Sequence, residues 1–491
     1  MPLLSKILKQ LNSAGYEATI GLEVHVQLNT ATKIFSSDAN GSDAEPNRNV
    51  SVISLGHPGT LPVLNESAVE KAVMMGLACG CEITRNGHFA RKSYFYPDLP
   101  KGYQTTQDKT PICVGGKVAA YGENLIQDAV ELHHIHLEED AGKSVHDDGP
   151  DTLIDLNRAG SPLIEIVTEP SIKSAEVAAA FLQEVRRMVR YLEISEANME
   201  KGELRCDANI SIKKIEDTAL GNKVEIKNMN SFAHVRKAIN YELERQLEMA
   251  EAGEEIAVET RTFDPAQGKT YGMRFKETMN DYRYFPCPDL PPVVITKEYL
   301  EATKNDMEVT PAAMRTFFES AKLNLQDVAL LTEEKELALY AKSAIEATRN
   351  AKAVANWLNG PIRALMNEKG LSINELGVSV AYLAELIQLV EDGKVVYQTA
   401  VQQLLPELQS KQEAPAKLAK AMNLMVAEDS SELEAIIDEV LISLPKEVKA
   451  FRNGKKKLMG LFMGEVMKKS RGKANPKQVQ PLLQQKLNEK K

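Results

Sequence analysis

The sequence predicts an α+β protein whose first part is a largely antiparallel sheet and whose remainder is helical. Short runs of alternating apolar and polar residues, separated by glycine and proline turn signals, fill residues 1–295 and are typical of antiparallel strands. Beyond them apolar residues recur at helical spacing, as in ELALYAKSAIEAT and VAYLAELIQLVE. All eight histidines lie between positions 25 and 234, so we expect the chemistry in the first part.

Length and charge divide the chain further. A chain of 491 residues is too long for one core, and SKQEAP near position 409 is a plausible linker. The net charge is −10, yet residues 446–491 carry 14 Lys or Arg against three Glu, so this tail has a net charge of +11 and the other 445 residues −21. Such a tail suits contact with phosphates, although a solvated helical tail is the alternative. The expected domains are a catalytic domain at 1–295, a helical domain at 296–408 and a basic helical tail at 409–491.

Composition excludes several classes of protein. No apolar run approaches the ~20 residues that cross a bilayer, and the first residues resemble neither a signal peptide nor a transit peptide. Five cysteines in so long a chain do not make a disulfide framework, which favours a reducing cytoplasm. Cys79 and Cys81 form a C-x-C pair without a second pair or a nearby histidine, so buried thiols are favoured over a zinc site.

Residues 19–30, TIGLEVHVQLNT, read as a strand that carries an acid and an imidazole on its polar face. Alternation places Glu23 and His25 together, opposite an apolar face. The segments GELRCDANISIK and KVEIKN repeat this pattern with faces rich in acids, amides, Arg and Lys. For one such strand alone, the simpler explanation is that its polar face is exposed to solvent. The repetition of the pattern on several strands favours a functional site instead.

Further acids lie where an ionised group needs a cation. Glu165 stands inside the apolar run PLIEIVTEP, where a carboxylate is costly unless paired or bound to metal. The histidine-rich strand IHLEEDAGK ends with Glu138, Glu139 and Asp140, which repel one another. Strict alternation puts Glu138 on the face of His136 and Glu139 on the other face. Carboxylates with one imidazole suit Mg²⁺ or Mn²⁺ better than structural zinc.

Nucleotide chemistry, if present, needs an unusual site. The chain has no P-loop motif, no glycine-rich dinucleotide motif and no evident Ser or Cys nucleophile motif. Phosphates would then be held by metal and by basic side chains on the sheet. The candidates are Lys101, Arg158, Arg205, Arg274, Lys276 and Arg283.

Nine segments occur in the order seen in one known family. They are IGLEVHVQL, LGHPGTLPVLN, RKSYFYPDLPKGYQ, LEEDAGKS, DLNRAGSPLIEIVTEP, GELRCDANIS, EIKNMNSF, ETRTFD and DYRYFPCPDLPP. Together they resemble the B subunits of the bacterial tRNA-dependent amidotransferases. The resemblance covers essentially the whole chain and implies a cradle-shaped sheet domain similar to glutamine synthetase, an all-α domain and a YqeY-like helical tail that binds tRNA.

The resemblance also implies an activity. Members phosphorylate the side-chain carboxylate of Glu-tRNA(Gln) and/or Asp-tRNA(Asn) with ATP and Mg²⁺, and ammonia then displaces the phosphate, which makes the enzyme a cytoplasmic carbon–nitrogen ligase. The ammonia comes from glutamine through a separate glutaminase, the A subunit, while a small C subunit makes the complex a heterotrimer. Some members hold zinc on cysteine pairs where this chain has KIFSSDANGSDAEPN, so no zinc is expected here.

The family's motif implies specific site residues. The positions that match its metal ligands are Glu23, His25, Glu139 and Glu165, with Glu138 as the alternative to Glu139. The match favours Glu139, which would require a bulge or the strand's end at that point. Arg158, Arg205 and Lys101 are expected to contact phosphate or the acceptor end of the tRNA.

Two other functions are compatible with parts of the pattern. A free-standing amide ligase acting on a small carboxylate would use the same polar strands, but it would not need the basic tail. A non-catalytic tRNA-binding scaffold would use the tail and leave the acidic faces merely solvated. Metal-dependent ATP turnover and dependence on aminoacyl-tRNA distinguish the three.

Overall fold

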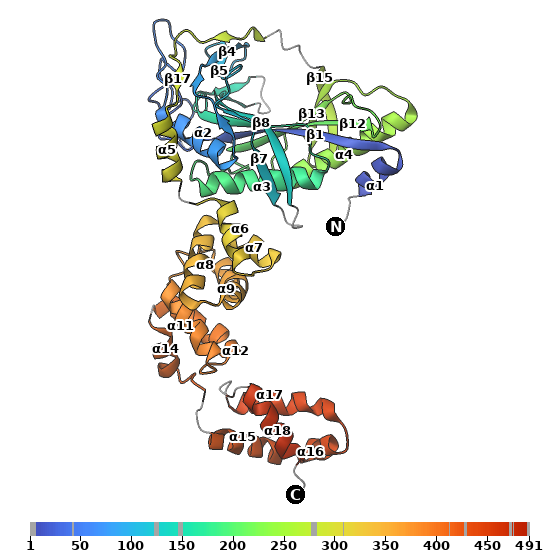
Figure 1. Cartoon of the computed structure of the whole chain (residues 1–491), viewed down its shortest axis with the longest axis vertical. Helices are drawn as coiled ribbons and strands as arrows, with labels where there is room; N and C mark the ends of the chain where they lie inside the picture. Colours follow the sequence, from blue (N-terminus) through green and yellow to red (C-terminus); the bar gives the residue numbers. More distant parts are fainter. Residues whose placement is uncertain are drawn as a thin grey trace. The chain divides into compact units, whose positions relative to one another are not determined.

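A large, mostly antiparallel sheet organises the first part of the chain in the computed structural model, as the strand pattern predicts (Figure 1). The structure describes residues 6–488 except 42–43, 122–126, 146–150, 276–281, 308, 412, 427–429, 471–473 and 475. The sheet is 13-stranded, with the central order β15-β14-β13-β12-β1-β11-β8-β5-β4-β16. Only β13 and β14 pair in parallel among the described strands.

The strands are β1 (Tyr16–Gln27), β2 (Glu82–Ile83), β3 (Asn86–Gly87), β4 (Ala90–Ser93), β5 (Tyr103–Thr106), β6 (Cys113–Val114), β7 (Lys117–Tyr121), β8 (Gln127–Glu139), β9 (Lys143–Val145), β10 (Leu153–Asp155), β11 (Pro162–Thr168), β12 (Leu204–Lys214), β13 (Val224–Lys227), β14 (Glu259–Asp264), β15 (Lys269–Phe275), β16 (Phe285–Pro286) and β17 (Val293–Val294). Strands β9 and β10 form a separate pair, as do β3 and β17. The helices of this part are α1 (Lys6–Ser13), α2 (Glu66–Ala78), α3 (Ala175–Tyr191), α4 (Phe232–Ala252) and α5 (Lys297–Asp306).

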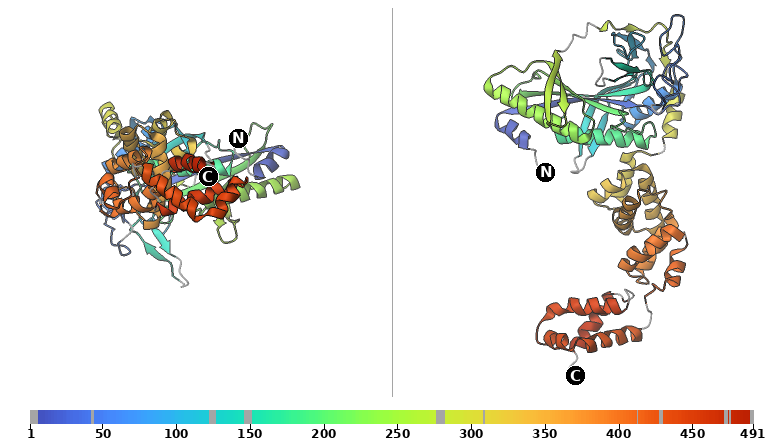
Figure 2. Two further views of the ribbon diagram at one scale, coloured as in Figure 1. Left: turned by 90° about the horizontal axis from the view of Figure 1, so that it is seen from below. Right: turned by 180° about the vertical axis from the view of Figure 1, so that it is seen from behind.

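Helices α3 and α4 lie along one face of the central strands (Figures 1 and 2). Each begins at a serine, Ser174 or Ser231, whose hydroxyl accepts a hydrogen bond from a main-chain N–H of the first turn. Helix α4 ends at Gly253, whose positive φ of 72° suits a left-handed cap. The apolar side chains of β1, including Leu22 and Val24, are buried in the main core. They lie on the face of the strand opposite its polar side chains.

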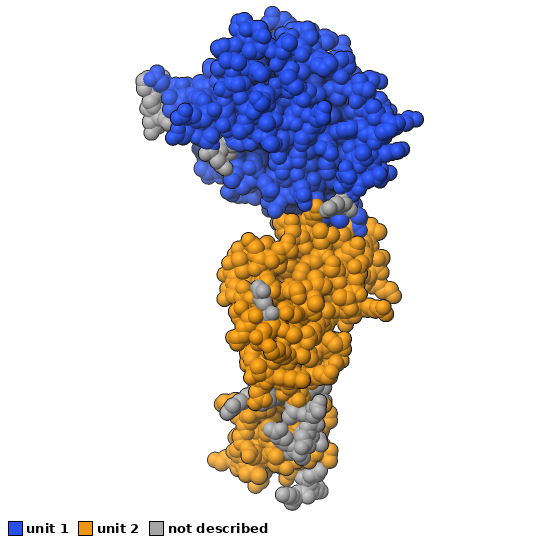
Figure 3. Space-filling view, turned by 90° about the vertical axis from the view of Figure 1, so that its left-hand side faces the viewer, with its two compact units in different colours: residues 1–313 blue, residues 314–491 orange. Residues whose placement is uncertain are grey.

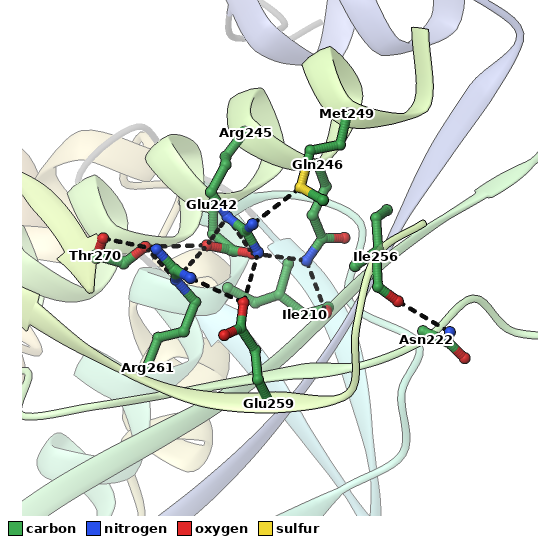
Figure 4. A network of polar contacts seen from close by, with 10 residues as sticks. All are labelled: Ile210, Asn222, Glu242, Arg245, Gln246, Met249, Ile256, Glu259, Arg261 and Thr270. Atoms are coloured by element: carbon green, nitrogen blue, oxygen red, sulfur yellow. Dashed lines mark hydrogen bonds and ion pairs between the residues drawn. The ribbon is translucent and has the colours of Figure 1, made fainter. Parts of the chain in front are cut away.

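A buried ionic network joins α4 to the hairpin of β14 and β15 (Figure 4). The Glu242 carboxylate is fully buried and accepts hydrogen bonds from Arg245 Nη2 at 2.6 Å and from Thr270 Oγ1 at 3.1 Å. Arg261 lies 3.7 Å from the same carboxylate and also pairs with Glu259 at 2.8 Å. The hairpin at the edge of the sheet is therefore held on α4 by charged contacts as well as by apolar packing.

The remainder of the chain is helical, and the molecule divides into two compact units, residues 1–313 and 314–491 (Figure 3). The first unit extends beyond the boundary expected near 295, because α5 packs against α2. The boundary near 409 stays a prediction. The described elements after residue 310 are α6 (Pro311–Ser320), α7 (Leu325–Leu331), α8 (Lys335–Thr348), α9 (Ala351–Trp357), η2 (Leu358–Ile362), α10 (Arg363–Lys369), α11 (Val380–Glu391), α12 (Tyr397–Thr399), η3 (Ala400–Leu404), α13 (Leu405–Lys411), α14 (Pro415–Ala421), α15 (Ser430–Ser443), α16 (Pro445–Arg452), η4 (Lys456–Leu458), α17 (Met459–Lys469) and α18 (Pro476–Asn488).

The last four α-helices share a small core of their own. Apolar residues between Ile437 and Leu487 are buried against one another there, with Phe451 and Phe462 in edge-to-face contact. None of the described helices has both the length and the apolar composition that crossing a bilayer requires.

Candidate active site

The polar side chains of the central strands line up in rows across one face of the sheet. Strand β1 pairs with β12 on one side and β11 on the other, so His25 stands opposite Arg205 and Glu165. One row further along, Glu23 stands opposite Asp207. The alternation predicted from the sequence therefore places these groups together, on strands that are distant along the chain.

The first cluster consists of His25, Glu138 and Glu165, whose ligand atoms all lie within 4.8 Å of one another. His25 Nε2 is 3.4 Å from Glu165 Oε2 and 3.7 Å from Glu138 Oε1. His136 borders the cluster, with its Nε2 3.4 Å from Glu165 Oε2. Burial by itself lowers the pKa of His25, but the two carboxylates outweigh it and raise this pKa to about 9. The same imidazoles lower the pKa of Glu165 although burial opposes this.

The second cluster consists of Glu23, Asp207 and Glu225, which also offer ligand atoms within 4.8 Å of one another. Burial and the neighbouring carboxylates raise the pKa of Glu23, so its charge is unfavourable without a cation. Lys227 lies 3.3 Å from Glu225 and also pairs with Asp207. The predicted metal residues are thus divided, because Glu23 and His25 belong to different rows about 6.6 Å apart along β1.

Two polar neighbours fix carboxylates of the second cluster. Asn209 donates its amide N–H to Glu23 Oε1 at 2.8 Å, and the Thr260 hydroxyl donates to Glu225 Oε2 at 3.0 Å. Such hydrogen bonds restrict the orientation of each carboxylate.

The structure places Glu138, the alternative, in the first cluster, and pairs Glu139 with Lys101, while which of the two binds metal stays a prediction. Strand β8 keeps its register with β11 from His134 to Glu139, so alternation continues to the end and Glu138 faces the first cluster. Glu139 faces away from it: its carboxylate lies 2.5 Å from Lys101 Nζ and accepts the Thr105 N–H at 2.7 Å. The bulge or strand end that Glu139 would have required before this position is not there in the described register.

The expected phosphate-binding side chains differ in their surroundings. Arg158 donates to the carbonyls of Ala141 and Gly142, so its guanidinium is largely occupied by main chain. Arg205 is more than one-third exposed and pairs with Asp140 at 2.7 Å. Lys101 is paired with Glu139 and lines a different cavity, of about 530 Å³. Of the three, Arg205 is the one beside the first cluster.

Three further basic candidates and the cysteines complete the set that the sequence singled out. Only the backbone of Arg274 is described, and Lys276 lies outside the described residues. Arg283 has a left-handed backbone with φ of 45°. All five cysteines fall within the described part of the chain as free thiols, Cys81 half-buried and the others buried.

Sequence reasoning did not assign Asp207, Glu225, Lys92 or Lys227 to the site. The first two were visible on polar strand faces, but nothing in the sequence indicated that those faces adjoin Glu23. Lys92 has its pKa raised by Tyr284, Glu138 and Glu165 against the effect of burial, which places its charge near the first cluster. No local signal in RKSYF marked this lysine.

Comparison with known proteins identifies the family. The model of the GatB/GatE catalytic domain matches residues 18–301, and that of the GatB domain matches residues 339–487. A protein of Trichodesmium erythraeum is 46% identical over 485 residues, which cover 96% of this chain and 98% of that protein. One of Geotalea daltonii is 46% identical over 477 residues, covering 96% and 99%. Both are named as the B subunit of aspartyl/glutamyl-tRNA(Asn/Gln) amidotransferase, and the chain therefore belongs to this family of amidotransferase B subunits.

Proposed function

We propose that this chain is the kinase and transamidase subunit of its amidotransferase. It transfers the γ-phosphoryl group of ATP to the side-chain carboxylate of Glu-tRNA(Gln) and/or Asp-tRNA(Asn), which gives ADP and an acyl phosphate. Ammonia then attacks the acyl carbon, the amide forms and inorganic phosphate leaves. The observation that carries this proposal is the pair of carboxylate clusters on one polar sheet face, since phosphoryl transfer needs positioned cations more than covalent catalysis.

The donor sets of both clusters fit magnesium. His25, Glu138 and Glu165 would hold one ion, and Glu23, Asp207 and Glu225 would hold a second. Bound Mg²⁺ would supply positive charge to offset that of the phosphate oxygens. Arg205 lies on the same face of the sheet, and its pairing with Asp140 holds the guanidinium in place. This guanidinium would bind a phosphate or the acceptor end of the tRNA.

Partners complete the reaction in this proposal. The chain carries no evident Ser or Cys nucleophile motif with which to release ammonia from glutamine. A separate glutaminase, the A subunit, would supply ammonia, while a small C subunit would make the complex a heterotrimer. The likeness of the sheet domain to glutamine synthetase belongs to the same proposal, since that enzyme also joins ATP, a carboxylate and ammonia.

The test is amidation of Glu-tRNA(Gln) and Asp-tRNA(Asn) by the complex of this chain with its partners, with ammonium supplied directly. We expect one ADP per amide formed, and no amide when ATP is omitted or Mg²⁺ is chelated. Amidation of free glutamate or aspartate at the same rate would favour the small-carboxylate ligase. Tight tRNA binding without any ATP turnover would favour the scaffold.

The basic tail gives a separate prediction. Its lysines at 455–457 are exposed, as are Lys468 and Lys469, while the tail's apolar side chains are buried in their own core. Removing residues 410–491 should weaken tRNA binding by about tenfold or more at 0.1 M salt and flatten its salt dependence, because fewer counterions are released. Filter binding over a salt series measures both. An unchanged affinity and slope would show that tRNA is bound elsewhere.

A further inference from the structure

Two of the five cysteines lie at the turn that follows α2. The helix ends at Cys79, and Gly80 continues the chain with a left-handed φ of 69° before Cys81. The N–H of Cys81 donates to the Gly76 carbonyl at 2.9 Å, which closes the turn. Two extended residues span up to about 7 Å, and a disulfide joins Cα atoms roughly 4.4–6.8 Å apart, so the closed turn keeps this pair within reach of a bond.

The two thiols are in direct contact. Each side chain hydrogen-bonds with the other, and this contact lowers the pKa of Cys81 although burial opposes it. The same contact, together with burial, raises the pKa of Cys79 well above its usual value. Cys81 is therefore the sulfur that more readily becomes a thiolate, which is the nucleophilic form. It is also half-buried, whereas the other four cysteines are buried.

We propose that Cys79 and Cys81 form a reversible redox site, in which a hydroperoxide oxidises Cys81 and Cys79 then closes a disulfide. The inference is independent of the proposed function, because it rests only on the contact, the exposure and the spacing of these two thiols. A solvent-accessible thiolate beside a second, resolving cysteine is the arrangement of redox-sensing sites.

The chemistry proceeds in two steps. The Cys81 thiolate attacks one oxygen of the peroxide, so an S–O bond forms, the O–O bond breaks and the other oxygen leaves as hydroxide or alkoxide. An electron pair passes from sulfur to the peroxide, which leaves a sulfenic acid. The Cys79 sulfur then attacks the sulfenic sulfur, the S–S bond forms, and the hydroxyl group leaves with the Cys79 proton as water. A dithiol reductant restores both thiols by exchange.

The neighbouring segment closes around the pair. Cys81 Sγ donates to the Gly115 carbonyl at 2.9 Å. A Cβ added to Gly116 would lie 2.6 Å from Cys81 Sγ and 2.9 Å from the Cys79 carbonyl oxygen, so the segment fits only because this residue is glycine. The disulfide has no S–H to donate, so oxidation would release the Gly115 contact.

Other roles for these thiols are less well supported. No cysteine belongs to the groups of three or more potential metal ligands found among the described residues, whereas structural zinc takes four. Cys113 on β6 is fully buried, with its Sγ 3.6 Å from the Ala72 carbonyl oxygen. Burial and the nearby Cys81 raise the pKa of Cys113 well above its usual value, so it stays a thiol.

The experiment treats the complex of this chain and its partners with hydrogen peroxide. Remaining thiols are alkylated, and the peptides are mapped by mass spectrometry with and without dithiothreitol. Trypsin releases residues 72–85 as one peptide that contains Cys79 and Cys81 and no other cysteine. Sulfenic acid is detected by its adduct with dimedone. The variants are Cys79→Ser and Cys81→Ser, with Cys113→Ser as the matched control.

In the wild type we expect this peptide to lose about 2 Da, the mass of two hydrogens, and to regain it with dithiothreitol. In Cys79→Ser the sulfenic acid of Cys81 should persist and give about tenfold more dimedone adduct than in the wild type, because no resolving thiol remains. Cys81→Ser should leave Cys79 reduced. Cys113→Ser should form the disulfide as the wild type does.

Three results would each overturn the redox site. They are a lasting sulfenic acid on Cys81 in the wild type, a disulfide from Cys81 to Cys113, and oxidation of the buried Cys206 or Cys287 as fast as that of Cys81. The wild-type peptide decides the question by itself if a serine variant does not fold, because the loss of two hydrogens within residues 72–85 requires both thiols.

Discussion

We expect that replacing Glu138 with Gln severely lowers the rate of ATP-dependent amidation, although the adjacent Glu139 matched the family's motif better. The amide keeps the shape of the side chain but removes a negative charge 3.7 Å from His25 Nε2, and with it one of the proposed metal ligands. Loss of such charge stabilisation should lower the rate by about a thousandfold, equivalent to about 4 kcal/mol of barrier. Ammonium-driven amidation of Glu-tRNA(Gln) is the measurement, with Mn²⁺ titration followed by electron paramagnetic resonance as a direct readout of metal binding.

Glu139→Gln is the matched comparison on the neighbouring residue. It should retain Mn²⁺ affinity, because its carboxylate pairs with Lys101 and not with the cluster. His25→Ala should resemble Glu138→Gln in both assays, with tRNA binding intact. Loss of Mn²⁺ in Glu139→Gln together with its retention in Glu138→Gln would restore the original choice of Glu139.

The largest effect on stability is expected at Glu242. Replacement by Ala removes the fully buried carboxylate that Arg245 of α4 and Arg261 of β14 share, and leaves Glu259 as their remaining acidic partner (Figure 4). Breaking a buried ion pair by removing one partner costs about 3–5 kcal/mol. The cost should appear first as local opening of this edge hairpin, because edge elements open more readily than the core.

Hydrogen exchange of the full-length chain measures that opening. Amides of β14, β15 and α4 should lose protection in Glu242→Ala, while those of β1 keep theirs. Glu45→Gln is the control, because its partner Arg48 is 73% exposed and such pairs contribute about 0–1 kcal/mol. Equal protection in the Glu242 variant and the wild type would show that the network contributes little.

Local periodicity was sufficient to predict the polar face of the sheet. The alternation in TIGLEVHVQLNT placed Glu23 and His25 on one face, and the structure has both there, opposite Asp207 and Arg205. The same rule placed Glu138 with His136, which the geometry supports over the family match. Alternation therefore predicted correctly which of the two side chains faces the first cluster, and metal binding by either one stays a prediction.

Strand alternation could not predict that the site residues divide into two separate clusters. That division depends on which strands are neighbours, and β1 lies between β11 and β12, each well over 100 residues away along the chain. Pairing at such separations is decided by the packing of the whole sheet on α3 and α4, not by any local pattern. For the same reason Glu225 and Lys227 could not be assigned to Glu23 from the sequence.

The adjacency of Glu138 and Glu139 has an evolutionary consequence. One carboxylate faces the first cluster and the next lines the cavity of about 530 Å³, so a single peptide unit separates two chemically distinct compartments. An insertion or deletion of one residue within β8 would turn each carboxylate to the opposite face of the sheet, so Glu138 would leave the first cluster and Glu139 would leave Lys101. Length changes in this strand should therefore survive among descendants only in pairs of residues, or outside the paired segment.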